Sequence, residues 1–167
     1  MERNSHSTFE ELEIYQIAAE FRRAMYQVAK RLPNFENFTL ANQIRRAGIS
    51  LTNNIAEGHG RFYYLEQIKF MLQSRGSLQE LIDDLNICED EHYLPTEEIT
   101  LLKEKGWRVR KLIDGYIRYL RAQKAASVRE DSGTYPNRDA DDLTNLDLTN
   151  PDLTNLDLTN LDLTNPE

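Results

Sequence analysis

Apolar residues in this chain recur at intervals of three and four over long stretches, the spacing that places side chains on one face of an α-helix. The clearest run is spaced 4, 3, 4 and 4 residues apart and consists of Leu40, Ile44, Ala47, Leu51 and Ile55. No stretch combines period-two alternation with the β-branched and aromatic residues typical of strands. The pattern therefore predicts an all-α fold.

Breaks in the pattern divide it into four predicted helices. We expect helices over residues 9–32, 40–58 and 63–91, and a fourth that follows Pro95 and ends near residue 126. Polar side chains at the helix starts give the expected N-caps, which are Ser7 or Thr8, Thr39 and Thr96. Because the links between the helices are short, neighbouring helices should run antiparallel. The prediction is an antiparallel up-down four-helix bundle.

The first predicted helix carries two apolar stripes. Ile14, Phe21 and Val28 belong to one stripe, and Tyr15 and Tyr26 belong to the other. A bundle helix needs only one stripe to face the core. The second stripe therefore either meets a neighbouring subunit or widens the face that is buried within one bundle.

Charge is distributed unevenly along the 167 residues. Residues 1–126 hold 18 Lys and Arg against 18 Asp and Glu, whereas residues 127–167 hold 2 Arg and 10 acidic residues. The net charge of −8 thus lies entirely in the last segment. The acidic balance of the whole chain therefore does not exclude nucleic-acid binding by the bundle.

The last segment ends in a short repeat. Residues 142–166 are five pentads of the form Asp-Leu-Thr-Asn-Leu/Pro, too few to stack into a solenoid core. We expect a disordered acidic tail over residues 142–167, a linker over 127–141, the bundle over 9–126 and an N-terminal arm over 1–8. The tail acts as an acidic lure or tether, or is the product of a tandem duplication.

No constellation of catalytic residues stands out, and we expect neither enzymatic activity nor a cofactor. Glu89 and His92 form a single Glu-x-x-His motif, whereas di-metal bundles use two such motifs, so no metal site is expected. A lone cysteine, Cys88, suits a reducing compartment. Residues 1–8 do not resemble a secretory signal, and no apolar run is long enough to span a membrane. These features predict a cytoplasmic protein.

Polar residues at helical spacing form a stripe beside the apolar face of the second predicted helix. The stripe consists of Arg46, Ser50, Asn54, Glu57 and Arg61. Side chains that border a core in this way commonly form hydrogen bonds and ion pairs between helices or subunits. The functional alternative is a nucleic-acid contact.

Basic residues line one flank of the fourth predicted helix, with Tyr119 near them. They include Arg110, Lys111, Arg118 and Arg121. This flank is either a surface that contacts phosphates or an ordinary solvated helix face.

Two motifs in the second and third predicted helices resemble those of a known family. The run Gln43-Ile-Arg-Arg-Ala47, with Ser50, Asn54-Ile-Ala-Glu-Gly58 and Arg61, is similar to bacterial four-helix-bundle proteins first noticed as products of intervening sequences in large-subunit ribosomal RNA genes. Gly76-Ser77-Leu78-x-Glu80-Leu81 resembles the second motif of that family. The resemblance covers roughly residues 9–123.

The resemblance implies a four-helix bundle that assembles into a ring-like homopentamer. It also links the chain to accessory proteins of diversity-generating retroelements, which bind nucleic acid and a reverse transcriptase. Our first hypothesis is therefore a non-enzymatic oligomeric scaffold that binds RNA, DNA or a nucleoprotein partner such as a reverse transcriptase. The alternative is a self-assembling protein-interaction module without nucleic-acid binding.

The hypotheses assign roles to two sets of residues. The candidate nucleic-acid-binding residues are Arg45, Arg46, Arg61, Arg110, Lys111, Arg118 and Arg121. The residues expected to define the fold and assembly are Ser50, Asn54, Glu57, Gly58, Gly76, Ser77 and Glu80. Among these, Gly76 and Ser77 should let a neighbouring helix approach closely, and Glu80 should pair with one of the arginines.

Overall fold

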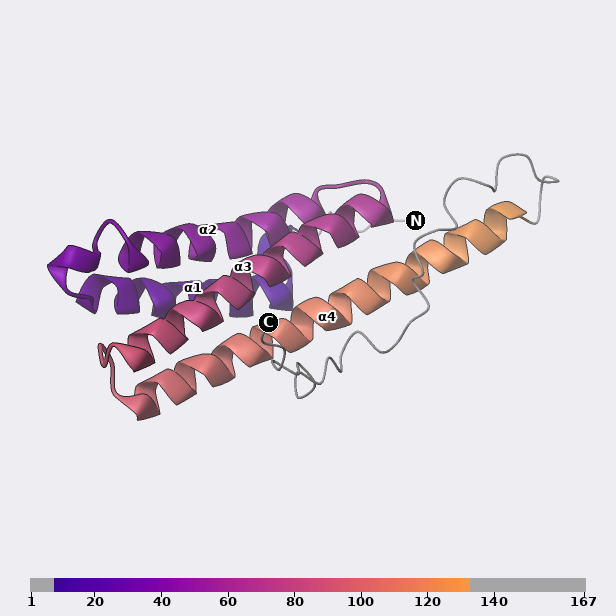
Figure 1. The fold of residues 1–167 in the computed structure, drawn as a ribbon. Coiled ribbons are helices and arrows are strands. Elements are labelled where there is room, and N and C mark those ends of the chain that lie inside the picture. The colour runs from indigo at the N-terminus through magenta and orange to yellow at the C-terminus, as the bar shows by residue number, and fades with distance from the viewer. Residues whose placement is uncertain (1–7, 133–167) are drawn as a thin grey trace, which may run out of the picture. The chain divides into compact units, whose positions relative to one another are not determined.

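Four helices pack side by side as an antiparallel up-down bundle in the computed structural model, which describes residues 8–132 (Figure 1). In chain order they are α1 (Glu13–Arg31), α2 (Leu40–His59), α3 (Tyr64–Asp90) and α4 (Thr96–Ser132). Two short 3-10 helices, η1 (Phe9–Glu11) and η2 (Asn34–Glu36), precede α1 and α2, and the described residues contain no strand. The predicted all-α bundle is confirmed.

The predicted start of the first helix and two of the predicted N-caps are wrong in detail, whereas α2 begins at Leu40 as predicted. Residues 9–11 form the separate turn η1, so α1 begins only at Glu13, and neither Thr8 nor Thr39 makes a side-chain cap hydrogen bond. The carboxylate of Glu36 caps α2 instead, because it accepts a hydrogen bond of 3.2 Å from the backbone N–H of Leu40. Hydrogen bonds from the Thr39 and Tyr93 hydroxyls and from Leu40 hold the pKa of Glu36 below its usual value.

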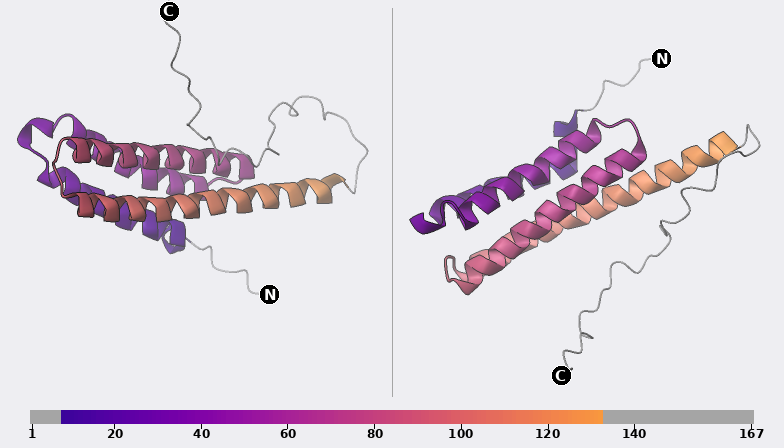
Figure 2. Two further views of the ribbon diagram at one scale, coloured as in Figure 1. Left: turned by 60° about the horizontal axis from the view of Figure 1, so that its bottom comes forward. Right: turned by 45° about the horizontal axis from the view of Figure 1, so that its top comes forward.

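The predicted end of the fourth helix is also wrong. Thr96 is the first residue of α4, and the helix runs to Ser132, past residue 126 and into the predicted linker. No glycine or proline interrupts the chain between Gly115 and Gly133, so nothing local stops the helix earlier. The C-terminal turns of α4 extend beyond the ends of the other helices in every view (Figures 1 and 2). Residues 1–7 of the predicted arm at 1–8 and the predicted tail at 142–167 lie outside the described residues.

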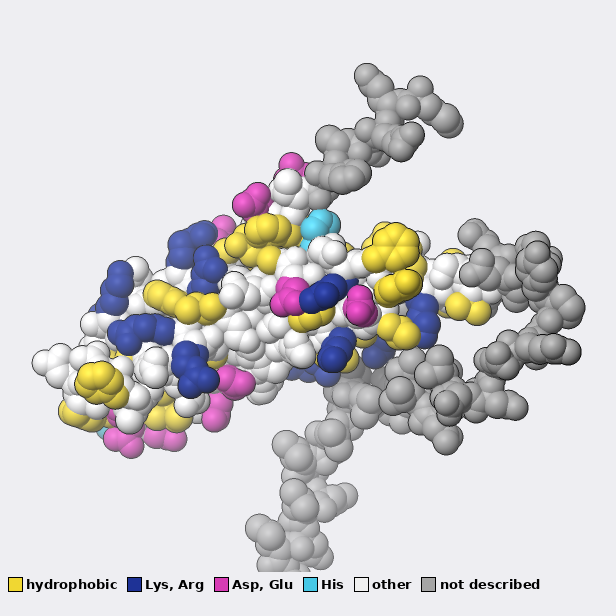
Figure 3. Space-filling view, turned by 90° about the horizontal axis from the view of Figure 1, so that it is seen from above, with side chains coloured by type: hydrophobic (Ala, Val, Ile, Leu, Met, Phe, Trp, Pro, Cys, Tyr) yellow, Lys and Arg dark blue, Asp and Glu magenta, His cyan; other side chains and the backbone are white. Residues whose placement is uncertain are grey.

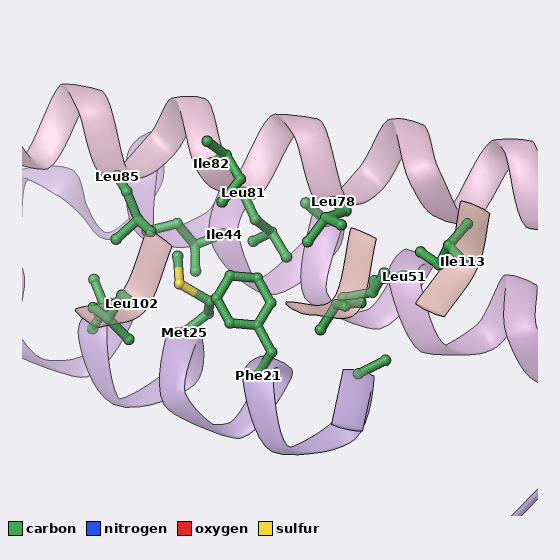
Figure 4. Packing of buried hydrophobic residues seen from close by; sticks show 14 of the residues in the cluster. Phe21, Met25, Ile44, Leu51, Leu78, Leu81, Ile82, Leu85, Leu102 and Ile113 are labelled. Atoms are coloured by element: carbon green, nitrogen blue, oxygen red, sulfur yellow. The ribbon is translucent and has the colours of Figure 1, made fainter. Parts of the chain in front are cut away.

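A single apolar core holds the four helices together. Aliphatic and aromatic side chains from all four helices converge between them, with Phe21 and Met25 of α1 at the centre (Figure 4). Each large side chain that is fully buried contributes about 1.5–3 kcal/mol to stability. At Gly106, an added Cβ would lie 2.5 Å from Ile82 Cδ1 and 3.2 Å from Phe21 Cζ, so this glycine lets α4 approach α1 and α3.

Cys88 is buried in this core, as its place in the apolar pattern predicts, and burial raises the pKa of its thiol to about 11. Within residues 8–132, no helix combines the length and apolar character that crossing a bilayer requires.

Candidate nucleic-acid interface

Several motif residues form a polar contact between α2 and α3. The Ser77 hydroxyl donates to the Ser50 hydroxyl over 2.8 Å, and the Asn54 amide donates to the Ser50 carbonyl and hydroxyl over 2.8 and 3.1 Å. One turn away, the buried Ser74 hydroxyl donates to the Leu51 carbonyl over 2.8 Å. The bonds from Ser77 to Ser50 and from Ser74 to Leu51 connect α3 to α2, whereas Asn54 bonds to Ser50 within α2 and so helps to hold the Ser50 side chain in place.

Gly58 and Arg61 lie at the end of this contact. A Cβ at Gly58 would lie 2.8 Å from Met71 Cε and 3.0 Å from Phe70 Cβ, so the glycine permits close packing of α2 on α3. Arg61 forms an ion pair with Glu57, and its guanidinium lies 4.8 Å from the centre of the Phe70 ring. Arg61 is therefore already engaged within the bundle.

Gly76 and Glu80 do not behave as expected within one chain. A Cβ added at Gly76 would meet nothing within 4 Å, so the expectation of a closely approaching helix is wrong for the isolated bundle. Glu80 is exposed, and among the described residues it forms no ion pair with an arginine. Both residues lie on a face of α3 that is open in this chain.

The basic flank of α4 is only partly available for ligands. Arg110 Nε lies 2.9 Å from the Asp114 carboxylate, which also pairs with Arg75 at 3.3 Å. Lys111, Arg118 and Arg121 are exposed and have no ion-pair partner in the described part of the chain. Glu89 of the single Glu-x-x-His motif accepts a 2.7 Å hydrogen bond from Lys103, and no metal-binding group of three side chains occurs within residues 8–132.

A second basic area lies along the contact of α1 and α2. We define the α1–α2 basic surface as Arg22, Arg23 and Lys30 of α1 with Arg45 of α2. Seen from the side of α2, several Lys and Arg side chains gather around exposed hydrophobic side chains near the α1–α2 connection (Figure 3). A groove of about 420 Å³ opens among Arg22, Arg23, Tyr26, Gln27, Lys30 and Ile49.

Close helix packing positions this surface. A Cβ at Gly48 would lie 3.2 Å from Arg22 Cγ and 3.5 Å from Tyr26 Cε2, so the missing side chain lets both residues rest on α2. The second apolar stripe of α1 is thus covered at Tyr26 by α2 of the same chain. Arg22 also donates a 2.7 Å hydrogen bond to the buried Thr52 hydroxyl, which fixes the direction of its guanidinium.

Among the described residues, no carboxylate forms an ion pair with the four cations of this surface. The ion pairs of the described residues involve other cations, namely Arg31, Arg61, Arg75, Lys103 and Arg110. Arg45 makes only a 3.5 Å hydrogen bond to the Ala29 carbonyl. Since neutralised pairs have little charge left to offer a ligand, the α1–α2 basic surface keeps its positive charge for an anionic ligand.

Sequence reasoning identified Arg45 but missed Arg22, Arg23 and Lys30. The three lie outside the motifs that drew attention to α2. The sequence does contain a pattern that indicates this surface. Arg23, Tyr26 and Lys30 follow one another at intervals of three and four, which places them on the side of the helix away from Phe21.

Arg46 faces a different groove, between α2 and α3. This open groove of about 890 Å³ is lined by Arg46 and Ser50 on α2 and by Glu80 and Ile87 on α3. Arg46 and Glu80 lie on opposite walls without forming an ion pair. Glu57, which belongs to the same polar stripe as Arg46, pairs with Arg61.

The fold and its motifs define a class of helical-bundle proteins in which serine side chains join the second helix to the third. The chain belongs to the family of 23S rRNA-intervening sequence proteins, whose model matches residues 10–115, more than half of the sequence. Among curated proteins, none matches the chain.

Proposed function

We propose that this protein is a non-enzymatic helical scaffold that binds nucleic acid through the α1–α2 basic surface. The observation that supports the proposal is a set of four cations along the α1–α2 contact that have no carboxylate partner among the described residues: Arg22, Arg23 and Lys30 line the groove, and Arg45 of α2 bonds to the Ala29 carbonyl of α1. Phosphate groups would supply the missing negative charge. The alternative surface for nucleic-acid binding lies on α4 and consists of the exposed residues Lys111, Arg118 and Arg121.

The spacing of these cations suits a phosphate backbone. Arg23 and Lys30 are seven residues apart in α1, which corresponds to about 10 Å along the helix. A nucleic-acid strand carries a phosphate about every 3.4 Å of its axis, so the surface spans more than one phosphate. The proposal extends to a nucleoprotein partner such as a reverse transcriptase, whose bound nucleic acid would present the same groups.

Salt dependence tests the proposal on the full-length chain. Each phosphate neutralised by Lys or Arg releases counterions, so log affinity should fall linearly with log salt with a slope of about −2 to −4 for three or four contacts. Fluorescence anisotropy with labelled RNA and DNA between about 25 and 200 mM salt measures this slope. Absence of binding at the lowest salt, or an affinity that does not respond to salt, would contradict the proposal.

A second candidate function, self-assembly into a homopentamer as a protein-interaction module, is favoured by the α2–α3 groove. Its walls carry the unpaired charges Arg46 and Glu80, and Phe38 at its rim is 91% exposed. A second copy that brings its own Glu80 to Arg46 would satisfy both charges. The exposed Gly76 on α3 offers that copy a surface without a side chain.

Charge reversal tests this assembly. Arg46→Glu or Glu80→Arg alone should weaken assembly more than about 10-fold, because like charges that face each other cost several kcal/mol. The double variant should restore it. Size-exclusion chromatography with light scattering reads the result, with Lys111→Glu on exposed α4 as the control. A monomeric wild type, or single variants that assemble like it, would overturn the assignment of this interface.

A further inference from the structure

The groove of the α1–α2 basic surface contains apolar side chains among its cations. Tyr26 and Ile49 line the groove together with Arg22, Arg23 and Lys30. Ile49 is 44% exposed although it lies in the middle of a helix. An exposed apolar patch ringed by positive charge is not what a purely ionic phosphate surface requires, because phosphates need only the cations. The ligand should therefore combine negative charge with an apolar face.

Two contacts hold the groove in a fixed shape before any ligand arrives. The Tyr26 ring lies against α2, since a Cβ at Gly48 would be 3.5 and 3.8 Å from its Cε2 and Cδ2 atoms. Arg22 is held by the Thr52 hydroxyl at 2.7 Å. Groups that are already ordered lose little conformational freedom when a ligand binds, which favours affinity.

Tyr26 is also free of aromatic neighbours. The ring pairs among the described residues join Phe9 with Tyr15, Phe35 with Tyr93, Phe62 with Tyr63, and Tyr116 with Tyr119. Tyr26 is half-buried and belongs to none of them. The ring is therefore not stacked on another aromatic side chain among the described residues, and it lines the groove together with Ile49.

We propose that this groove is a base-binding pocket, so that the α1–α2 basic surface selects single-stranded nucleic acid over duplex. An unpaired base would stack on Tyr26 and contact Ile49, while Arg22, Arg23 and Lys30 bind the flanking phosphates. The side-chain amide of Gln27, which also lines the groove, can donate to and accept from the edge of the base. A duplex keeps its bases stacked inside and can present only phosphates to the cations.

This inference rests on the proposed nucleic-acid binding, and one experiment on the full-length chain separates the two. A labelled single-stranded RNA and a duplex of the same sequence and length are titrated at low salt. The wild type should bind the single strand about 5- to 100-fold more tightly, the range expected for stacking of one base. A 2-aminopurine placed in the single strand should lose fluorescence on binding.

Substitutions at Tyr26 locate the pocket. Tyr26→Leu keeps an apolar side chain against Gly48 but removes the aromatic face, so it should lose about 5- to 100-fold in single-strand affinity and leave duplex affinity within about twofold. Tyr26→Phe should bind like the wild type. Tyr119→Ala, which removes the exposed tyrosine beside the basic flank of α4, is the matched control and should change neither affinity.

Thermal unfolding of each variant checks that the bundle remains folded. If Tyr26→Leu is unstable, the pocket is tested by whether Tyr26→Phe still binds single-stranded RNA more tightly than duplex RNA. If the wild type and Tyr26→Phe each bind the single strand and the duplex with equal affinity, the proposal of a base-binding pocket is refuted. The proposed nucleic-acid binding would remain. If Tyr119→Ala weakens single-strand binding and Tyr26→Leu does not, the base binds on α4 and the proposed pocket is refuted. Failure to bind either RNA would refute the proposed function itself.

Discussion

Replacing Asp84 by Asn should remove most of the pH dependence that this side chain gives to the stability of the bundle between about pH 4 and pH 7. Asp84 is fully buried between α2 and α3. One carboxylate oxygen accepts a 2.9 Å hydrogen bond from the Gln43 amide, and the other has no hydrogen-bond partner. Burial, together with the nearby charges of Asp83 and Glu80, raises the pKa of Asp84 from 3.8 to about 7, against the lowering effect of Gln43.

The sign of the effect follows from this raised pKa. Below pH 3.8 the carboxyl group is protonated in both the folded and the unfolded chain, and the stability it contributes is fully present. As the pH rises toward 7, the unfolded chain releases the proton while the folded chain retains it, so stability falls. The loss is complete above pH 7 and reaches at most about 4 kcal/mol.

Chemical denaturation at several pH values measures this difference. The free energy of unfolding of Asp84→Asn minus that of the wild type should increase from pH 4 to pH 7 and then level off. Asp83→Asn removes the neighbouring charge that helps to raise the pKa of Asp84, so its pH dependence should be slightly weaker than that of the wild type but much stronger than that of Asp84→Asn. A constant difference between Asp84→Asn and the wild type would show that the pKa of Asp84 is the same in the folded and the unfolded chain, which would contradict the raised pKa.

The arrangement of the helices was largely predictable because the apolar pattern reports the core directly. All five residues of the α2 run are buried, namely Leu40, Ile44, Ala47, Leu51 and Ile55. The pattern failed where a helix turns its apolar residues outward. Leu65 and Leu72 fit the helical spacing of α3, yet they are exposed, since the N-terminal part of α3 presents Ile68 and Met71 to the core instead.

The candidate binding surface was less predictable, because it depends on which cations find acidic partners. Glu57 lies in the last turn of α2 and Arg61 two residues past its end, and this pair at a spacing of four residues can be inferred from sequence. The pair of Arg75 with Asp114 joins α3 to α4, and only the packed bundle brings these residues together. The same holds for the groove at Tyr26, which exists because Gly48 on another helix leaves room for the ring.

Removing three cations from the α1–α2 basic surface should have the largest effect on nucleic-acid binding. The variant Arg22→Ala, Arg23→Ala, Lys30→Ala loses about three phosphate contacts, so we expect about 100-fold weaker RNA binding near 100 mM salt and a salt slope smaller in magnitude by about 2–3. The matched control, Lys111→Ala, Arg118→Ala, Arg121→Ala, removes the same charge from exposed positions on α4. It should lower affinity by less than about fivefold.

The salt titration of RNA binding by these two triple variants beside the wild type, all as full-length chains, is the most direct test of the proposed interface. The account predicts a reduced slope and weak binding for the α1–α2 variant alone, with the α4 variant close to the wild type. Equal losses in both variants would indicate unspecific attraction by total charge, and a loss confined to the α4 variant would place the interface on α4; either result would contradict the account.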